Sequence, residues 1–262
     1  MLKRLDALLT VAFGTAEVQR FDRCFAALHQ TAVQRFVGLT CEMALTSPRI
    51  QAKLARQGMA LPLVEEALAS LQASGCRRVV VLSLFFANGK EWEKLGAQIG
   101  SWRSRFDELI LTPPLLTHSL TACAQTLSEL FPVSEKPRIL LGHGQSQGCN
   151  DDYSALQQVL DDLHRSDLRI ALLHGEPSLM QSMNALRMEG CRSASLNFLM
   201  LCAGHHAAEI SASVQNLTTE DVSLSLDISS MELGACPDFQ QLFLTQLDQV
   251  LSSPPVISDF IL

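Results

Sequence analysis

Short apolar runs alternate with amphipathic stretches along the whole chain. Eight runs rich in Val, Ile, Leu and Phe indicate buried strands, at residues 8–14, 36–43, 78–86, 109–116, 138–143, 168–174, 194–201 and 222–228. Stretches with apolar residues at helical spacing lie between them, at residues 63–73, 153–164, 179–188 and 239–251. Strands that alternate with helices predict βαβ units and parallel sheets.

An internal repeat indicates how the eight strands are divided. Residues 71–91 align with residues 186–206, so that the tripeptide Gly-Cys-Arg at 75–77 meets Gly-Cys-Arg at 190–192. The first and fifth strands also end alike, in Phe-Gly-Thr and His-Gly-Gln. We therefore predict an α/β fold of two similar open, mostly parallel four-stranded sheets flanked by helices, and not a closed barrel.

The boundary between the halves is expected where helical periodicity breaks, at residues 132–137 (Pro-Val-Ser-Glu-Lys-Pro). This predicts an N-terminal half over residues 1–133 and a C-terminal half over residues 134–262. Open α/β sheets bind ligands beyond the carboxyl ends of their strands. With two such sheets, the active site is expected in the cleft between the halves.

Composition narrows the classes of function. Hydrophobic residues make up 47% of the chain and the formal net charge is −7, which argues against a nucleic-acid-binding protein. No apolar stretch approaches the length of a membrane span, and Asp6 interrupts the N-terminal apolar run, which is expected to be a strand and not a signal peptide. The eight cysteines are scattered without a C-x-x-C pair, as in reduced cytosolic proteins. We expect a cytoplasmic protein without a nucleic-acid or membrane partner; the oligomeric state stays open, a homo-oligomer included.

Four histidines follow three successive strands of the second half. His143 ends the fifth strand, His174 ends the sixth, and His205 and His206 follow the seventh. Neighbouring strands lie about 4.8 Å apart, so these imidazoles can converge on one ion. Imidazole suits Co²⁺, Ni²⁺, Fe²⁺ and Zn²⁺. The pattern predicts a metal or catalytic site, the alternative being polar strand ends that only cap helices.

Two carboxylates are further candidates. Glu176 stands two residues beyond His174 and can offer an oxygen to the same ion. Glu91 takes the position of His206 in the repeat, although it also suits the charged first turn of a helix. Glycines beside the strand ends allow a large flat ligand to approach the backbone closely.

Other catalytic motifs are not supported. Residues 144–148 have the form G-x-S-x-G, but a serine hydrolase needs its serine directly at the strand end, where His143 stands. The chain has neither a Walker A motif nor G-x-G-x-x-G, so no nucleotide cofactor is expected.

Taken together, the chain resembles the single-chain sirohydrochlorin cobalt chelatases of anaerobic cobalamin synthesis, the CbiK-type class II chelatases. The likeness runs along nearly the whole sequence. It rests on residues 11–15 (Val-Ala-Phe-Gly-Thr), 88–94 (Asn-Gly-Lys-Glu-Trp-Glu-Lys), 112–116 (Thr-Pro-Pro-Leu-Leu), 141–144 (Leu-Gly-His-Gly) and 201–207 (Leu-Cys-Ala-Gly-His-His-Ala).

The resemblance implies a metal and a tetrapyrrole bound between two α/β halves, with two histidines and a glutamate as metal ligands. His143 and His206 match the two histidines, while His174 stands where the family has its glutamate. The chain thus departs from the pattern. Either three histidines form the metal site, or Glu176 supplies the carboxylate, and the change bears on metal preference.

The resemblance also implies the reaction, which is insertion of a divalent metal substrate, cobalt, into sirohydrochlorin or precorrin-2 without a nucleotide. His143 and His206 are expected to hold the metal or to accept pyrrole protons near neutral pH. The residues expected to contact the ring are Phe13, Gly14, Thr15, Gly89, Lys90, Glu91, Gly144, Gly204 and His205. The alternatives are a chelatase for iron or nickel, or a tetrapyrrole- or metal-binding protein that does not catalyse insertion.

Overall fold

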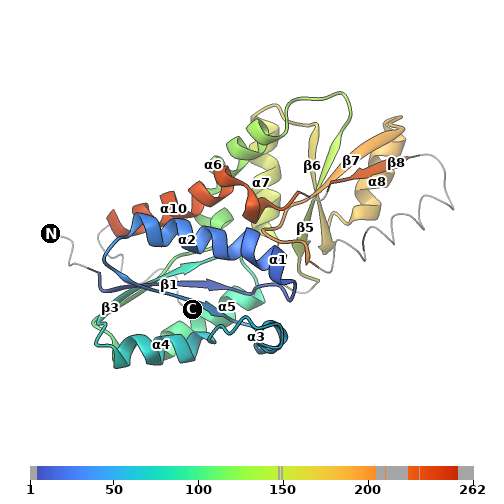
Figure 1. Ribbon diagram of the computed structural model, residues 1–262. Coiled ribbons are helices and arrows are strands. Elements are labelled where there is room, and N and C mark those ends of the chain that lie inside the picture. Colours follow the sequence, from blue (N-terminus) through green and yellow to red (C-terminus); the bar gives the residue numbers. More distant parts are fainter. Residues whose placement is uncertain are drawn as a thin grey trace.

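The computed structural model describes residues 5–146, 148, 150–204, 210, 224–229 and 231–252. Within these ranges the strands form two four-stranded sheets, in the orders β2-β1-β3-β4 and β6-β5-β7-β8, and every pair is parallel. The second order repeats the first, strand for strand. Figure 1 shows the two sheets in separate halves of the molecule, each with helices on both faces. The predicted architecture is confirmed.

The first half comprises β1 to β4 and the helices around them. Its strands are β1 (Ala7–Ala12), β2 (Thr40–Leu45), β3 (Arg78–Ser83) and β4 (Glu108–Leu111). Its helices are α1 (Val18–Phe21), the π-helical turn η1 (Asp22–Ala26), α2 (Ala27–Arg35), α3 (Pro48–Ala55), α4 (Val64–Ala73), α5 (Lys90–Trp102), the 3₁₀ turn η2 (Arg103–Arg105) and α6 (Leu115–Leu130).

The second half comprises β5 to β8, and the last of its described elements is a long helix. Its strands are β5 (Arg138–Gly144), β6 (Leu168–His174), β7 (Ser193–Phe198) and β8 (Ser225–Ile228). Its helices are α7 (Asp151–Asp162), α8 (Leu179–Met188), the 3₁₀ turn η3 (Leu233–Ala235) and α10 (Pro237–Ser252). No helix in the described ranges is both long and apolar enough to cross a membrane.

Two strand predictions in the first half were misplaced. The run at 109–116 ends as a strand at Leu111, because Pro113 and Pro114 have no N–H to donate to a neighbouring strand, and α6 begins at Leu115. The run at 36–43 begins too early, because Phe36 still closes α2 and Gly38 turns the chain at a φ of +92° before β2 starts. The apolar residues were recognised correctly, but their helical or extended state was not.

The sequence repeat is realised as the same turn in both halves. Gly75 follows α4 at a φ of +81° and Gly190 follows α8 at +84°, the left-handed region that favours glycine. After each glycine a cysteine N–H reaches back over the helix end, Cys76 to the Leu71 carbonyl and Cys191 to the Leu186 carbonyl, both at 3.0 Å. This hydrogen bond ends the helix and directs the chain into β3 or β7.

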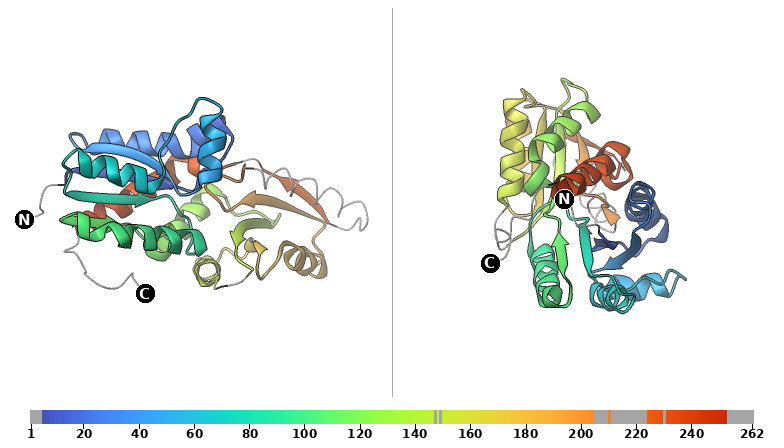
Figure 2. Two further views of the ribbon diagram at one scale, coloured as in Figure 1. Left: turned by 90° about the horizontal axis from the view of Figure 1, so that it is seen from below. Right: turned by 90° about the vertical axis from the view of Figure 1, so that its left-hand side faces the viewer.

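The two halves share one core. Two apolar clusters each belong to one half, but the third and largest contains strand residues of both sheets together with α6, α7 and α10. Helix α10 runs back over the first half (Figures 1 and 2), where the Phe239 ring lies 6.3 Å from that of Phe86 and Arg35 pairs with Asp248. The division at residues 133/134, in the loop between α6 and β5, remains our proposal for the domain boundary.

Candidate metal centre

The ends of β5 and β6 bring two histidines together. Gly144 pairs with His174 in the parallel ladder, so His143 and His174 emerge side by side at the carboxyl edge of the second sheet. Their ring centroids lie 5.1 Å apart, edge to face at 62°, and both side chains are exposed. Adjacent imidazoles at this separation can bind one ion after small side-chain rotations.

The tautomer of His143 follows from its backbone contact. Its Nδ1 lies 2.8 Å from the Gly144 carbonyl oxygen, which can only accept a hydrogen bond. Nδ1 must therefore carry the proton, and Nε2 presents the lone pair that a metal requires. A carbonyl that orients a histidine in this way is a common feature around metal ligands.

Two glycines make this edge possible. At Gly144, where φ is +62°, a Cβ would lie 2.1 Å from the His174 carbonyl oxygen. At Gly142, a Cβ would lie 2.5 Å from Cε1 of Tyr153. Larger residues would push the two histidine-bearing strands apart or displace the helix beneath them.

Tyr153 and Asn150 support the edge, and the sequence did not predict their role. Burial raises the pKa of Tyr153 to about 12, opposed by hydrogen bonds from the Gly144 and His143 backbone to its phenol. Asn150 closes the loop through both of its amide atoms: its Oδ1 accepts from Gln145 N at 2.9 Å, and its Nδ2 donates to Gln145 O at 3.0 Å. The asparagine at the start of a helix, before two aspartates, was the signal available.

Of the remaining predicted ligands, only Glu176 lies within the described residues. Glu176 is exposed in the loop after β6, with Oε1 3.5 Å from Nε2 of Gln181. It does not complete a group of three close ligand atoms with His143 and His174 among the described residues. His205 and His206 lie outside the described residues. The metal ligands, His143 and His174 included, therefore stay a prediction.

Residues of the first half contact the carboxyl edge of the second sheet. A Cβ at Gly89 would lie 3.6 Å from the Gln145 side chain, and one at Gly204 would lie 3.4 Å from Oγ1 of Thr15. Asn88 N also donates to Oδ2 of Asp152 at 2.7 Å. The carboxyl ends of strands from both sheets therefore face one another, as expected for a site between the halves.

The other predicted ring contacts lie at the same strand ends of the first half. Phe13 follows β1 with 42% of its surface exposed, an unusual position for a phenylalanine. Gly14 follows it at a φ of +86°. Lys90 and Glu91 are exposed in the first turn of α5. Their contact with a ring remains a prediction.

Comparison with known proteins decides the family. A family model described as cobalt chelatase (CbiK) matches residues 6–252. The chain belongs to this family. Within it, the sirohydrochlorin cobaltochelatase of Salmonella typhimurium is 29% identical to this chain over 212 residues, which cover 79% of this chain and 80% of that protein.

Solved structures share the cobalt chelatase fold described here. The structure of SirB from Bacillus subtilis with Fe³⁺ has a TM-score of 0.69 at 15% identity and covers 95% of this chain and 96% of its own. The sirohydrochlorin chelatase SirB of Bacillus subtilis subspecies spizizenii, in complex with cobalt, also has a TM-score of 0.69, at 14% identity over 96% of this chain and 97% of its own. At these identities the likeness establishes the fold.

Proposed function

We propose that this chain inserts Co²⁺ into sirohydrochlorin or precorrin-2 in the cytoplasm, without a nucleotide. Membership of the cobalt chelatase family and the Salmonella relative support the reaction class. The observation that carries the proposal in this chain is the pair of imidazoles, 5.1 Å apart, at the edge where the two halves meet. Imidazole nitrogens are ligands that suit Co²⁺.

Insertion must exchange two pyrrole protons for one divalent ion. In our proposal His143, through Nε2, and His174 hold the incoming Co²⁺ together with His206. An imidazole released by the metal accepts one pyrrole proton, and the second pyrrole proton passes to solvent water. The contact of His143 Nδ1 with the Gly144 carbonyl orients the ring and leaves Nε2 as the unprotonated nitrogen. Tyr153 and Asn150 hold the backbone beneath this histidine and limit its movement.

The tetrapyrrole carries carboxylates that need hydrogen-bond donors. Backbone N–H groups at Gly14 and Thr15, close to the start of α1, and the exposed ammonium of Lys90 are our candidates. Because Thr15 lies against Gly204, a ring held there would lie beside the segment that leads to His206.

His174 stands at the position of the family glutamate, and this replacement bears on which metal ion the site prefers. A third neutral imidazole leaves the bound ion with its full charge, whereas a carboxylate would cancel one unit. We propose that cobalt is the metal, and the same ligand types also suit iron and nickel. The choice among these metals is therefore the first variable to test.

The test is anaerobic insertion of Co²⁺, Fe²⁺ and Ni²⁺ into sirohydrochlorin, followed by absorbance. Wild type is compared with His143→Ala, His174→Ala and Glu176→Ala, and with His118→Ala, an exposed histidine of α6, as the matched control. We expect multiple turnovers with Co²⁺, lost in His143→Ala and retained in His118→Ala. A rate no higher than the protein-free control with every metal would rule out the enzyme and leave a tetrapyrrole- or metal-binding protein.

A further inference from the structure

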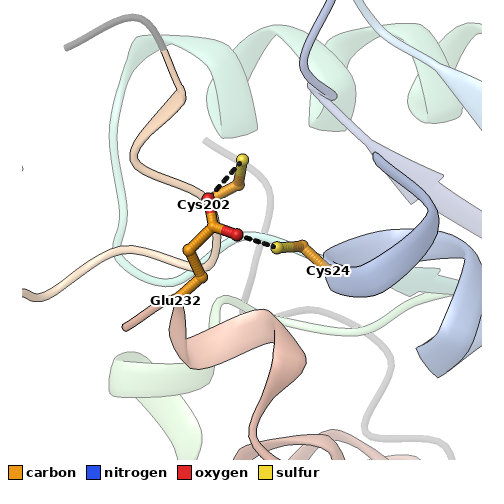
Figure 3. Close-up of side chains that lie close together, drawn as sticks. All are labelled: Cys24, Cys202 and Glu232. Carbon is orange, nitrogen blue, oxygen red and sulfur yellow. Dashed lines mark hydrogen bonds between the residues drawn. The ribbon is translucent and has the colours of Figure 1, made fainter. Parts of the chain in front are cut away.

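A second cluster of metal-binding side chains lies away from the two histidines. The ligand atoms of Cys24, Cys202 and Glu232 all lie within 4.8 Å of one another, and no other described residues form such a group of three (Figure 3). The Cys24 thiol donates to Oε2 of Glu232 at 3.4 Å, and the Cys202 thiol donates to Oε1 at 3.5 Å. Three segments distant in sequence thus direct sulfur and oxygen to one point.

Close backbone packing at Gly234 holds these three segments together. A Cβ at Gly234 would lie 2.7 Å from the carbonyl oxygens of both Cys24 and Leu201, so only glycine fits between the two cysteine-bearing segments. Gly234 N also donates to the Leu201 carbonyl at 2.9 Å. Cys24 lies in the five-residue π-helical turn η1, a rare conformation that often occurs at functional sites.

The charges around Glu232 suit a cation held by thiolates. The Glu232 side chain is only 6% exposed, and its oxygens accept from Nη1 of Arg20 at 2.9 Å and Nη2 of Arg23 at 3.4 Å. A carboxylate offers about four acceptor positions, so these bonds leave room for a metal. A divalent ion with two thiolates and one carboxylate has a net charge of −1, which the two guanidinium groups offset.

The cluster can be reached from solvent. Glu232, Arg20 and Arg23 line a cavity of about 460 Å³, together with Leu130, Met231, Ala235 and Cys236. Neither Cys24 nor Cys202 lines this cavity, so it meets the cluster at the Glu232 carboxylate.

We propose that Cys24, Cys202 and Glu232 form a second metal site, which binds a thiophilic divalent ion such as Zn²⁺. Binding releases both thiol protons to solvent, and the ion takes two sulfurs, one carboxylate oxygen and one water in a tetrahedral arrangement. Thiolate ligands favour zinc, whereas the imidazole pair at β5 and β6 lacks sulfur. The bound ion would fasten the Cys202 segment, which leads to Gly204, to η1 of the other half.

The test uses Co²⁺ as a spectroscopic probe of the full chain, purified metal-free under anaerobic conditions. A thiolate-to-cobalt charge-transfer band in the near ultraviolet should reach the intensity of one thiolate-bound Co²⁺ per chain and disappear when Zn²⁺ is added. We expect Cys24→Ala and Cys202→Ala to lose the band, and Cys41→Ala, a partly buried thiol in β2, to keep it. His143→Ala should also keep it, which separates this site from the proposed chelatase centre.

Loss of the band in the cysteine variants could also result from unfolding, so a variant with both thiols intact serves as a second test. Glu232→Gln preserves side-chain shape but removes one ligand charge, and it should weaken Zn²⁺ affinity by roughly tenfold or more. Circular dichroism would verify that each variant is folded. Absence of the band in wild type, or a band that survives in both alanine variants, would overturn the proposal, and neither result depends on sirohydrochlorin insertion.

Discussion

The two halves have the same framework but different strand ends. Phe13-Gly14 follows β1 where β5 ends in His143-Gly144, and both glycines have positive φ. The Leu45 N–H donates to Pro62 O, and the equivalent Leu172 N–H donates to Pro177 O. This equivalence aligns His174 with Ser47, the residue that caps α3. A duplicated scaffold can thus carry a histidine pair in one half alone by changing a few side chains beyond otherwise equivalent strands.

The largest expected contrast is between the two strand-end glycines. Gly144→Ala places a Cβ against the His174 backbone, which cannot move without separating β5 and β6, whereas Gly14→Ala meets the flexible Leu45 side chain at 2.9 Å. Both variants also place alanine at a positive φ. We expect Gly144→Ala to lower the free energy of unfolding by about 3 kcal/mol or more, and Gly14→Ala to lower it by about 1–2 kcal/mol. Urea denaturation would measure both losses of stability, and equal losses would show that the contact with the His174 backbone adds nothing.

The next comparison is between His174, at the end of β6, and its counterpart Ser47 beyond β2. We expect His174 to act in metal insertion and Ser47 to act only in stability. His174→Ala should lower the rate of cobalt insertion by roughly a hundredfold, because one of the paired imidazoles is lost. Ser47→Ala, its counterpart, should leave the rate unchanged and lower stability by about 1 kcal/mol through loss of the helix cap. Steady-state insertion kinetics and thermal melts check both. A comparable loss of rate in Ser47→Ala would place catalytic groups in both halves.

The repeated helix ends should respond alike. Neither Gly75 nor Gly190 has any other atom within 4 Å of a Cβ, so alanine there meets only the cost of a positive φ. We expect each substitution to lower the free energy of unfolding by about 1 kcal/mol. Differences in denaturation midpoint between Gly75→Ala and Gly190→Ala would show that the two turns are not equivalent energetically.

The smallest effect concerns an ion pair of the second half. A hydrogen bond from Arg165 lowers the pKa of Asp167 below its usual value, so the folded state favours the ionised carboxylate. Its stabilisation is present above the unfolded pKa of about 3.9 and is lost as the pH falls through the lower folded pKa. Asp167→Asn keeps an oxygen acceptor for Arg165 and should lower the free energy of unfolding by roughly 0.5–1 kcal/mol at pH 7. The difference from wild type should shrink as the pH falls below about 4, as followed by urea denaturation at each pH.

The sequence predicted the sheets and the edge of the site because strand ends and glycine turns are local signals. His143 and His174 follow from the end of an apolar run alone. Where local signals conflict, as at Pro113 and Pro114, an apolar run gave the wrong secondary structure. The support from Tyr153 and the approach of Cys24 to Cys202 depend on packing between segments far apart in the chain, and no residue spacing encodes that.

Helix α10 has a consequence for how the protein is made. Its residues Phe239 and Phe243 complete a core that includes Leu8 of β1, and Gln246 donates to the Pro113 carbonyl at 2.8 Å. The strands of the first half therefore keep part of their apolar surface uncovered until α10 has left the ribosome. During synthesis the first half is expected to remain a loosely packed intermediate, and a chain truncated before residue 237 should be caught by chaperones or aggregate.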